Sequence, residues 1–139
     1  MAQVEFGGVG ALEGKKAHGF VSVANTSGQI PIHVPVWIAN GRSEGPIFCV
    51  VAGIQGTEYS GMEAVGHLMN QLDAETVRAK IVAVPCVNTF GLGKSSACSL
   101  DQRNINRISP GRLDESISGL ITHILFAQPP DSDLALQPR

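Results

Sequence analysis

The chain has 139 residues, of which 43% are hydrophobic and 16% are charged, and its formal net charge is −2. This length fits one domain, and the composition is that of a folded protein with a buried core. The small negative charge argues against a nucleic-acid-binding protein, which would carry a basic patch. No run approaches the roughly 20 consecutive apolar residues of a transmembrane helix, so we expect no membrane partner.

Three cysteines, Cys49, Cys86 and Cys98, match no CxxC spacing. Cys49 and Cys86 lie in apolar, strand-like runs, where a free cysteine is usually a small buried hydrophobic residue. Cys98 lies in a polar segment without a neighbouring group that would mark it as a nucleophile. Reduced thiols, together with the absence of a visible secretory signal at the N-terminus, predict a cytoplasmic protein.

The N-terminal third of the chain predicts two strands. Residues 1–28 are rich in glycine and weakly patterned, and we interpret them as an edge segment with a short strand at 18–24. Residues 30–38 then alternate apolar side chains on one face. Pro31 and Pro35 favour an edge strand there, because proline has no N–H to donate to a neighbouring strand.

The middle of the chain predicts a βαβ unit. Residues 47–52 form a continuous apolar run, which is typical of a strand buried on both faces. A helix is expected from Ser60, because apolar residues then recur at helical spacing, and the next apolar run at 80–86 predicts another strand. The apolar stripe of this helix consists of Met62, Val65, Leu68, Met69 and Leu72.

The last part of the chain predicts a long loop and a second helix. Residues 88–112 are polar and lack periodicity, and loops of this length in a compact domain are usually functional or disordered. A helix is predicted at 116–128, where apolar residues again share one face, and two prolines end it. The tail at 131–139 is short and polar, so we expect no further core element from it.

Three motifs follow one another in a specific order. They are GIQGTEYSG at 53–61, VPCVN at 84–88 and DQRNINRISPG at 101–111. Their order and spacing resemble the succinylglutamate desuccinylase/aspartoacylase family of zinc-dependent deacylases, which is related to zinc carboxypeptidases. The resemblance covers roughly residues 28–128. It implies an α/β fold with a central mixed β-sheet and flanking helices, equivalent to the N-terminal part of a zinc-carboxypeptidase-like domain.

On this resemblance we divide the chain into three parts. Residues 1–28 form the N-terminal glycine-rich edge segment, residues 29–128 the partial deacylase-like α/β domain, and residues 129–139 the short polar tail. Family domains are longer, so this chain would be an incomplete version of one. An uncovered sheet edge invites pairing with another chain, and we therefore expect possible self-association.

The first motif carries the zinc ligands of the family, a His and a Glu in the pattern G-x-H-G-x-E. In this chain Glu58 stands at the Glu position and Gln55 at the His position. Zinc in such sites usually has two His, one Glu and an open position for water. It lowers the pKa of that water and polarises the scissile carbonyl. The alternative interpretation of these residues is structural: Glu58 caps the following helix and Gln55 hydrogen-bonds the turn.

The other family groups for metal and catalysis are not evident. The second His ligand belongs to a D-L-H type motif, and the nearest match here has Ala135 in its place. The general base is a Glu further downstream, and the chain ends before that position, so no catalytic residue is assigned. The remaining histidines are expected to be partly buried or on the surface; they are His18, His33, His67 and His123.

The third motif contains the pair that binds substrate in the family. Asn106 and Arg107 match an N-R motif that clamps the substrate carboxylate, and a guanidinium can bind a carboxylate through two hydrogen bonds. Asp101, five residues before Asn106, is expected to order the loop. The alternative is a solvated loop arginine whose hydrogen bonds are only structural.

Two functions therefore remain open. The first is a zinc-dependent deacylase that cleaves the N-acyl amide of a small carboxylate-bearing substrate, with Zn²⁺ as the cofactor. The second is a truncated or degenerate homologue without catalysis that binds at most a small anion. Gln55, Ala135 and the missing downstream base favour the second function.

Overall fold

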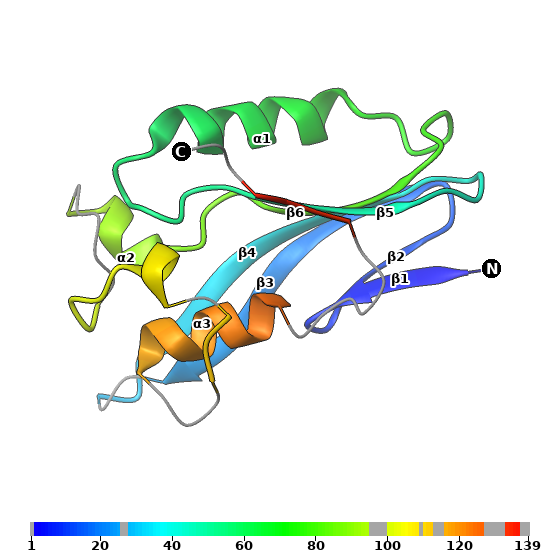
Figure 1. The fold of residues 1–139 in the computed structure, drawn as a ribbon. Coiled ribbons are helices and arrows are strands. Elements are labelled where there is room, and N and C mark those ends of the chain that lie inside the picture. The colour runs from blue at the N-terminus through cyan, green and yellow to red at the C-terminus, as the bar shows by residue number, and fades with distance from the viewer. Residues whose placement is uncertain are drawn as a thin grey trace.

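The computed structural model describes residues 2–25, 28–94, 100–108, 110–112, 116–126 and 133–136. Figure 1 shows a twisted sheet with α1 on one face and α3 on the other. The strands are β1 (Gln3–Phe6), β2 (Val9–Leu12), β3 (Lys15–Asn25), β4 (Pro31–Asn40), β5 (Ile47–Val51), β6 (Lys80–Val84) and β7 (Asp133–Leu136). The helices are α1 (Tyr59–Gln71), α2 (Thr89–Leu92) and α3 (Ile117–Phe126), with a 3₁₀ turn η1 (Ile105–Arg107).

The main sheet has five strands in the order β3-β4-β6-β5-β7, and β1 and β2 form a separate hairpin. β3, β4 and β6 pair antiparallel, whereas β5 pairs parallel with both β6 and β7. The predicted βαβ unit is β5-α1-β6. This mixed sheet with flanking helices is the α/β architecture expected from the sequence, and it brings the carboxyl ends of β5 and β6 to one edge of the sheet.

Successive side chains of β6 point to opposite faces of the sheet and pack in two separate apolar layers. Val82 and Val84 pack in the larger cluster, which includes Ile121 of α3. Ile81 and Ala83, on the opposite face, pack in a second cluster with the buried residues of α1. A strand whose two faces are both covered needs apolar residues at every buried position, which explains the continuous apolar run at 81–84. The sheet is therefore anchored between α1 on one face and α3 with η1 on the other.

The expectation that residues 30–38 form an edge strand is wrong. β4 lies between β3 and β6 in the sheet. The prolines fit because β4 pairs with β3 along its length but with β6 only through residues 37–40. The half of β4 that holds Pro31 and Pro35 thus has one strand neighbour among the described residues, and their missing N–H groups need not interrupt a ladder on the other side.

The expectation that the tail adds no further element is also wrong. Residues Asp133–Leu136 form β7, which pairs in parallel with β5 from Phe48 to Val51. The physical reason is the open edge of β5, whose backbone N–H and C=O groups require partners. Residues 129–132 and 137–139 of the predicted tail lie outside the described residues.

The N-terminal segment is tied to the main sheet. β3 belongs to that sheet, and the Asn40 side-chain amide donates to the carbonyl oxygens of Ala11 at 2.9 Å and Ala2 at 3.2 Å. These bonds attach the β1–β2 hairpin to the end of β4. The proposed boundaries at residues 28 and 128 stay a prediction. No helix in the described part of the chain has the length and apolarity to cross a membrane.

Candidate functional site

The turn after β5 is built around Gly53. This residue has φ +62°, the left-handed region that favours glycine, and an added Cβ would lie 2.9 Å from Cys86 Cα. The parallel ladder continues past the strands, because Val87 N–H donates to Ala52 O at 3.1 Å and Asn88 N–H donates to Gly53 O at 2.9 Å. The turn is therefore fixed to the segment that follows β6, at the carboxyl edge of the sheet.

A second close backbone contact holds the middle of the turn. A Cβ added to Gly56 would overlap the backbone carbonyl of Gly91 in the short helix α2. Gly91 is itself placed by the buried Asn88, whose Oδ1 accepts from Gly91 N–H at 2.9 Å. Glycine at position 56 thus allows the turn and α2 to touch through their backbones, and this contact fixes the residues on either side of Gly56.

Gln55 and Glu58 are joined by two hydrogen bonds. Gln55 N–H donates to Glu58 Oε2 at 3.1 Å, and Glu58 N–H donates to Gln55 O at 3.2 Å. Glu58 occupies the N-cap position of α1, but its side chain makes no hydrogen bond to the first turn of the helix. The cap alternative for Glu58 is therefore wrong as a description of its contacts. The carboxylate turns back onto the loop and closes it.

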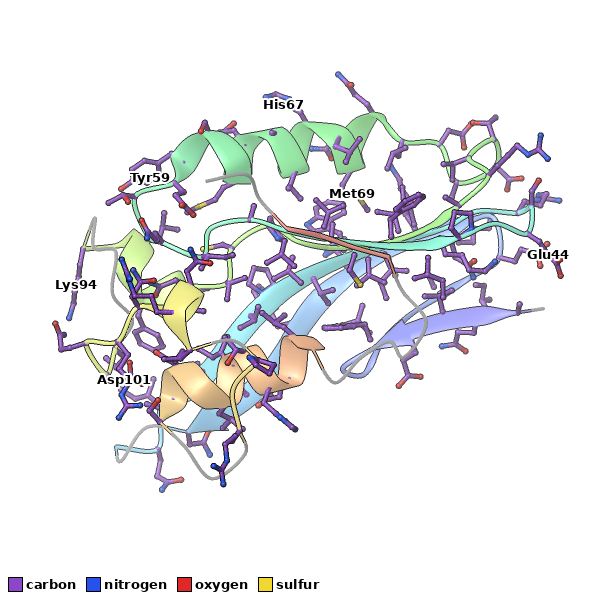
Figure 2. All side chains as sticks on the ribbon, in the orientation of Figure 1. Glu44, Tyr59, His67, Met69, Lys94 and Asp101 are labelled. Carbon is purple, nitrogen blue, oxygen red and sulfur yellow. The ribbon has the colours of Figure 1, made fainter. Side chains whose placement is uncertain are left out.

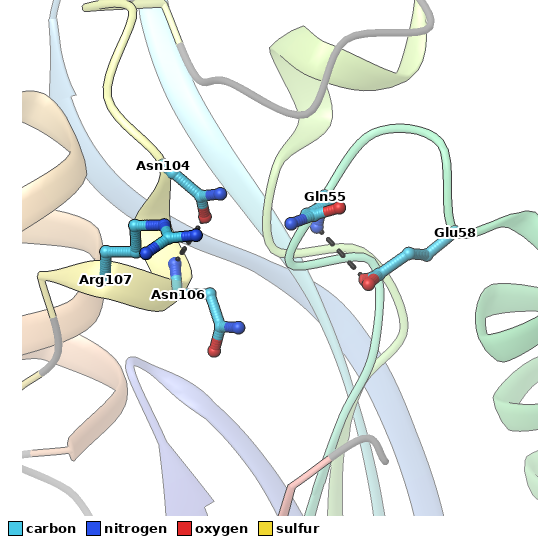
Figure 3. Close-up of a pocket in the computed structure, with 5 residues that line it drawn as sticks. All are labelled: Gln55, Glu58, Asn104, Asn106 and Arg107. Carbon is cyan, nitrogen blue, oxygen red and sulfur yellow. Dashed lines mark hydrogen bonds between the residues drawn. The ribbon is translucent and has the colours of Figure 1, made fainter. Parts of the chain in front are cut away.

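The 3₁₀ turn η1 lies across from the loop that follows β5 (Figure 3). Asn104 Oδ1 accepts from Asn106 N–H at 3.0 Å, and Asn104 O accepts from Arg107 N–H at 3.0 Å. Ile105, which is 2% exposed, anchors the turn in the apolar cluster beneath α3. Asn106 and Arg107 are both exposed, so the buried Ile105 fixes the backbone while their polar groups remain open to solvent.

Asp101 connects this loop to the start of α3. Its carboxylate accepts from Ser118 Oγ at 2.6 Å and from Ser118 N–H at 2.9 Å, and it also accepts from Arg103 N–H at 3.1 Å. Burial alone would raise the pKa of Asp101, but hydrogen bonds from Ser118, Arg103 and Ser116 outweigh burial and hold that pKa below its ordinary value of 3.8. The predicted ordering role of Asp101 thus has a concrete partner in Ser118.

The loop after β5 and the turn η1 face one another across a pocket of about 320 Å³ and form its two walls. Figure 3 shows Gln55 and Glu58 on the loop after β5, with the three residues of the η1 wall across from them. The pocket is lined by Gln55, Glu58, Asn104, Asn106 and Arg107. The four side chains that the sequence analysis singled out for metal and substrate are therefore brought together, although two motifs about 50 residues apart supply them.

Asn104 was not assigned a role from the sequence. Its position two residues before Asn106 is the signal that could have identified it, because an Asn side chain often accepts the N–H two residues later. Ser118 could not have been found in the same way. It acts on Asp101 through the fold, across 17 residues of sequence.

The donor set of the pocket does not fit a catalytic zinc site. Such a site needs three protein ligands, usually with imidazoles among them, whereas the described lining of this pocket offers one carboxylate, on Glu58, and the neutral amide oxygens of Gln55, Asn104 and Asn106. Within the described ranges no three His, Cys, Asp or Glu residues come together as a metal-binding group. The chemistry of these donors supports binding by hydrogen bonds better than coordination of zinc.

The histidines lie on other elements. His18 is on β3 and stacks on Trp37, with 4.8 Å between the ring centroids, while His33 is on β4. His67 is exposed on α1, where Figure 2 shows it on the side away from the sheet, and His123 lies on α3. None of the four lines the pocket.

The two described cysteines are buried thiols, as expected. Burial raises the pKa of the Cys86 thiol, and a backbone hydrogen bond involving Asn88 only partly offsets it. Cys86 is therefore a poor nucleophile although it lies next to the turn. Cys98 lies outside the described residues. Ala135 is paired with Val50 in the β5–β7 ladder.

Comparison with known proteins identifies the same family over most of the described chain. The profile of the succinylglutamate desuccinylase/aspartoacylase catalytic domain matches residues 44–128. The chain is 32% identical over 127 residues to the N-alpha-acetyl-L-2,4-diaminobutyric acid deacetylase of Halomonas elongata, covering 86% of this chain and 36% of that protein.

Solved structures give a consistent result. The succinylglutamate desuccinylase/aspartoacylase of Rhodobacter sphaeroides superposes with a TM-score of 0.78 at 26% identity, covering 87% of this chain and 39% of that one. The product-bound ectoine utilization protein EutE (DoeB) of Ruegeria pomeroyi gives a TM-score of 0.76 at 26% identity, covering 86% and 38%. The chain thus spans less than half the length of these relatives.

Proposed function

The chain belongs to the succinylglutamate desuccinylase/aspartoacylase family, and from this premise we propose that its pocket binds the small N-acyl amino acid substrate of a deacylase. Arg107 and Asn106 bind the substrate carboxylate, and the loop of Gln55 and Glu58 faces the acyl amide. Hydrolysis of that amide is the reaction we propose for the lineage. One observation carries the proposal: the pocket joins the 53–61 turn and the 101–111 loop at the carboxyl edge of the sheet.

The substrate class follows from the charges of the pocket. Among the described residues Arg107 is the one cationic residue that lines the pocket, and a guanidinium matches a carboxylate in both charge and geometry. Asn104 and Asn106 add amide groups that can hydrogen-bond the same ligand. The name of the Halomonas elongata relative describes an N-acetylated diamino acid, which is a small carboxylate-bearing molecule of this kind.

Zinc dependence is proposed for the lineage, whereas in this chain Glu58 is the one strong donor and Gln55 stands at the position of the family His. An amide oxygen is a weaker zinc ligand than an imidazole nitrogen, so we expect this chain to hold zinc poorly. The second candidate function, a homologue that binds a small anion without catalysis, is favoured by this one substitution.

Replacing Arg107 with methionine tests the substrate site. Loss of a charged hydrogen-bonding group is expected to weaken binding of an N-acetyl-L-amino acid by about 10- to 100-fold, measured by isothermal titration calorimetry. Arg107→Lys should give an intermediate loss, because lysine keeps the charge without the two-pronged geometry. Arg103→Met is the matched control, since Arg103 is exposed in the same loop but does not line the pocket. Equal affinities for the wild type and Arg107→Met would reject the proposal.

Replacing Gln55 with histidine tests the metal. We expect the wild-type chain to bind zinc at well below one ion per chain, and Gln55→His to bind more, because an imidazole then joins the Glu58 carboxylate. Elemental analysis after dialysis against a zinc-containing buffer gives the ratio, and acetate release from N-acetyl-L-amino acids shows whether hydrolysis accompanies it. Stoichiometric zinc in the wild type would contradict the expectation. An unchanged ratio in Gln55→His would show that this loop does not form the site.

Three wider properties remain proposals. The buried thiols of Cys49 and Cys86 support a reducing, cytoplasmic location. The open edge of β3, an 11-residue strand, supports possible self-association through strand pairing, which light scattering would detect. A small-molecule ligand is the expected partner, with no nucleic acid or membrane.

A further inference from the structure

Opposite charges line the two walls of the pocket. Glu58 lies on the loop after β5, and Arg107 lies on η1 across from it (Figure 3). Among the described residues, neither side chain forms an ion pair. The two charges are therefore separated by the cavity, and a ligand that enters can meet both.

Whether the Glu58 carboxylate is available to a ligand decides which ligand fits. Gln55 N–H donates to Oε2, and a carboxylate oxygen can accept further hydrogen bonds. Because the donors present do not form a zinc site, no metal charge is available to neutralise this carboxylate. Gln55 adds an amide oxygen beside it, which is a second acceptor. This wall of the metal-free pocket thus attracts a positively charged donor.

From this arrangement we propose that the metal-free pocket selects a small zwitterionic α-amino acid, with its carboxylate on Arg107 and its ammonium on Glu58. The inference rests on the proposed substrate site and names a ligand class for it. A free amino acid carries both charges on one small molecule, so it can offer a carboxylate to Arg107 and an ammonium to Glu58. An N-acyl amino acid keeps the carboxylate but replaces the ammonium with a neutral amide. The pocket therefore binds the deacylated product class more tightly than the acylated substrate class.

The volume and the polarity of the pocket limit the size and type of the ligand's side chain. A cavity of about 320 Å³ lies at the lower end of ordinary ligand pockets, which begin near about 300 Å³. The described residues that line it all have polar side chains: two asparagines, one glutamine, one glutamate and one arginine. Such walls do not favour a large apolar side chain, so the amino acids that fit are the small or polar ones.

The test compares L-alanine with N-acetyl-L-alanine, which differ only in the acyl group. Chemical-shift titration of the ¹⁵N-labelled chain in EDTA-containing buffer at pH 7 measures both affinities without metal. We expect L-alanine to bind about tenfold more tightly, the effect of one charged hydrogen bond. Glu58→Gln should bring the ratio close to one. Its amide oxygen can still accept from Gln55 N–H, so the turn is retained while the charge is removed.

Glu63→Gln is the matched control. It removes one negative charge from α1, where Glu63 is exposed and pairs with His67 outside the pocket, and it should leave the tenfold ratio unchanged. Equal binding of the two ligands, or an unchanged ratio in Glu58→Gln, overturns the inference. If N-acetyl-L-alanine still binds in an Arg107-dependent manner, the proposed function survives that result. If Arg107→Met alters neither affinity, the substrate site itself is rejected.

Discussion

Alanine at position 101 is expected to weaken binding of a carboxylate ligand about tenfold, although Asp101 does not line the pocket. The Asp101 carboxylate accepts hydrogen bonds from Ser118 Oγ–H and N–H at the start of α3. It also accepts from Arg103 N–H within its own loop. Without these bonds the loop keeps the buried Ile105 but loses its attachment to the helix. Arg107 then samples positions away from the ligand, and affinity falls while the guanidinium is still present.

The same substitution should lower the free energy of unfolding by about 0.5–2 kcal/mol, because the Asp101 carboxylate accepts an N–H of the first turn of α3 as a capping side chain does. Asp73→Ala is the matched control. Asp73 Oδ1 accepts from Glu75 N–H at 2.9 Å, the same two-residue pattern that joins Asp101 to Arg103, but no bond to a distant helix is involved. Asp101→Asn should recover part of the affinity because one acceptor oxygen remains. An affinity that is unchanged in Asp101→Ala would contradict the positioning role.

The pH dependence of this contact has a definite sign. Because the pKa of Asp101 is lowered in the folded protein, its carboxylate stabilises the fold at pH values above the ordinary pKa of 3.8. That contribution is lost as the pH falls below 3.8 and through the lower folded value. Urea midpoints should therefore decline in this acidic range more steeply for the wild type than for Asp101→Asn, which has no charge to lose.

The sequence predicted the elements well wherever one face or two faces carried a clear apolar pattern. β5, α1, β6 and α3 are confirmed for that reason, because periodicity reports burial directly. Position within the sheet was harder to predict. Pro31 and Pro35 led to the wrong expectation of an edge strand, because the sequence does not show that β6 pairs with only the last four residues of β4. β7 was missed because it depends on the open edge of β5, which is a property of the assembled sheet.

The site could be predicted to the level of side chains but not of contacts. Gln55, Glu58, Asn106 and Arg107 were singled out by motif, and all four line one pocket. Their roles stay proposals. What the motif could not supply was the return of the Glu58 carboxylate onto Gln55 N–H, because a residue at an N-cap position is ordinarily expected to cap its helix.

Alanine at position 56 is expected to have the largest effect on stability, about 3 kcal/mol. The added Cβ would overlap the Gly91 carbonyl, which is backbone and cannot move aside as a side chain can. Either the turn or α2 must shift, and Gln55 and Glu58 shift with the turn. A loss of this size is a large share of the about 5–15 kcal/mol that stabilises an ordinary domain. Urea denaturation gives the free energy of unfolding.

Gly66→Ala is the matched control, and it is expected to raise the free energy of unfolding. Among the described residues nothing lies within 4 Å of a Cβ at Gly66, which is inside α1, so alanine there should stabilise the chain by about 0.5–1 kcal/mol through its helix propensity. The two variants add the same methyl group, and only the surroundings differ. If Gly56→Ala is as stable as Gly66→Ala, the backbone contact between the turn and α2 does not exist in solution. The placement of Glu58 opposite Arg107 would then lose its physical basis, since that contact fixes the loop on which Glu58 lies.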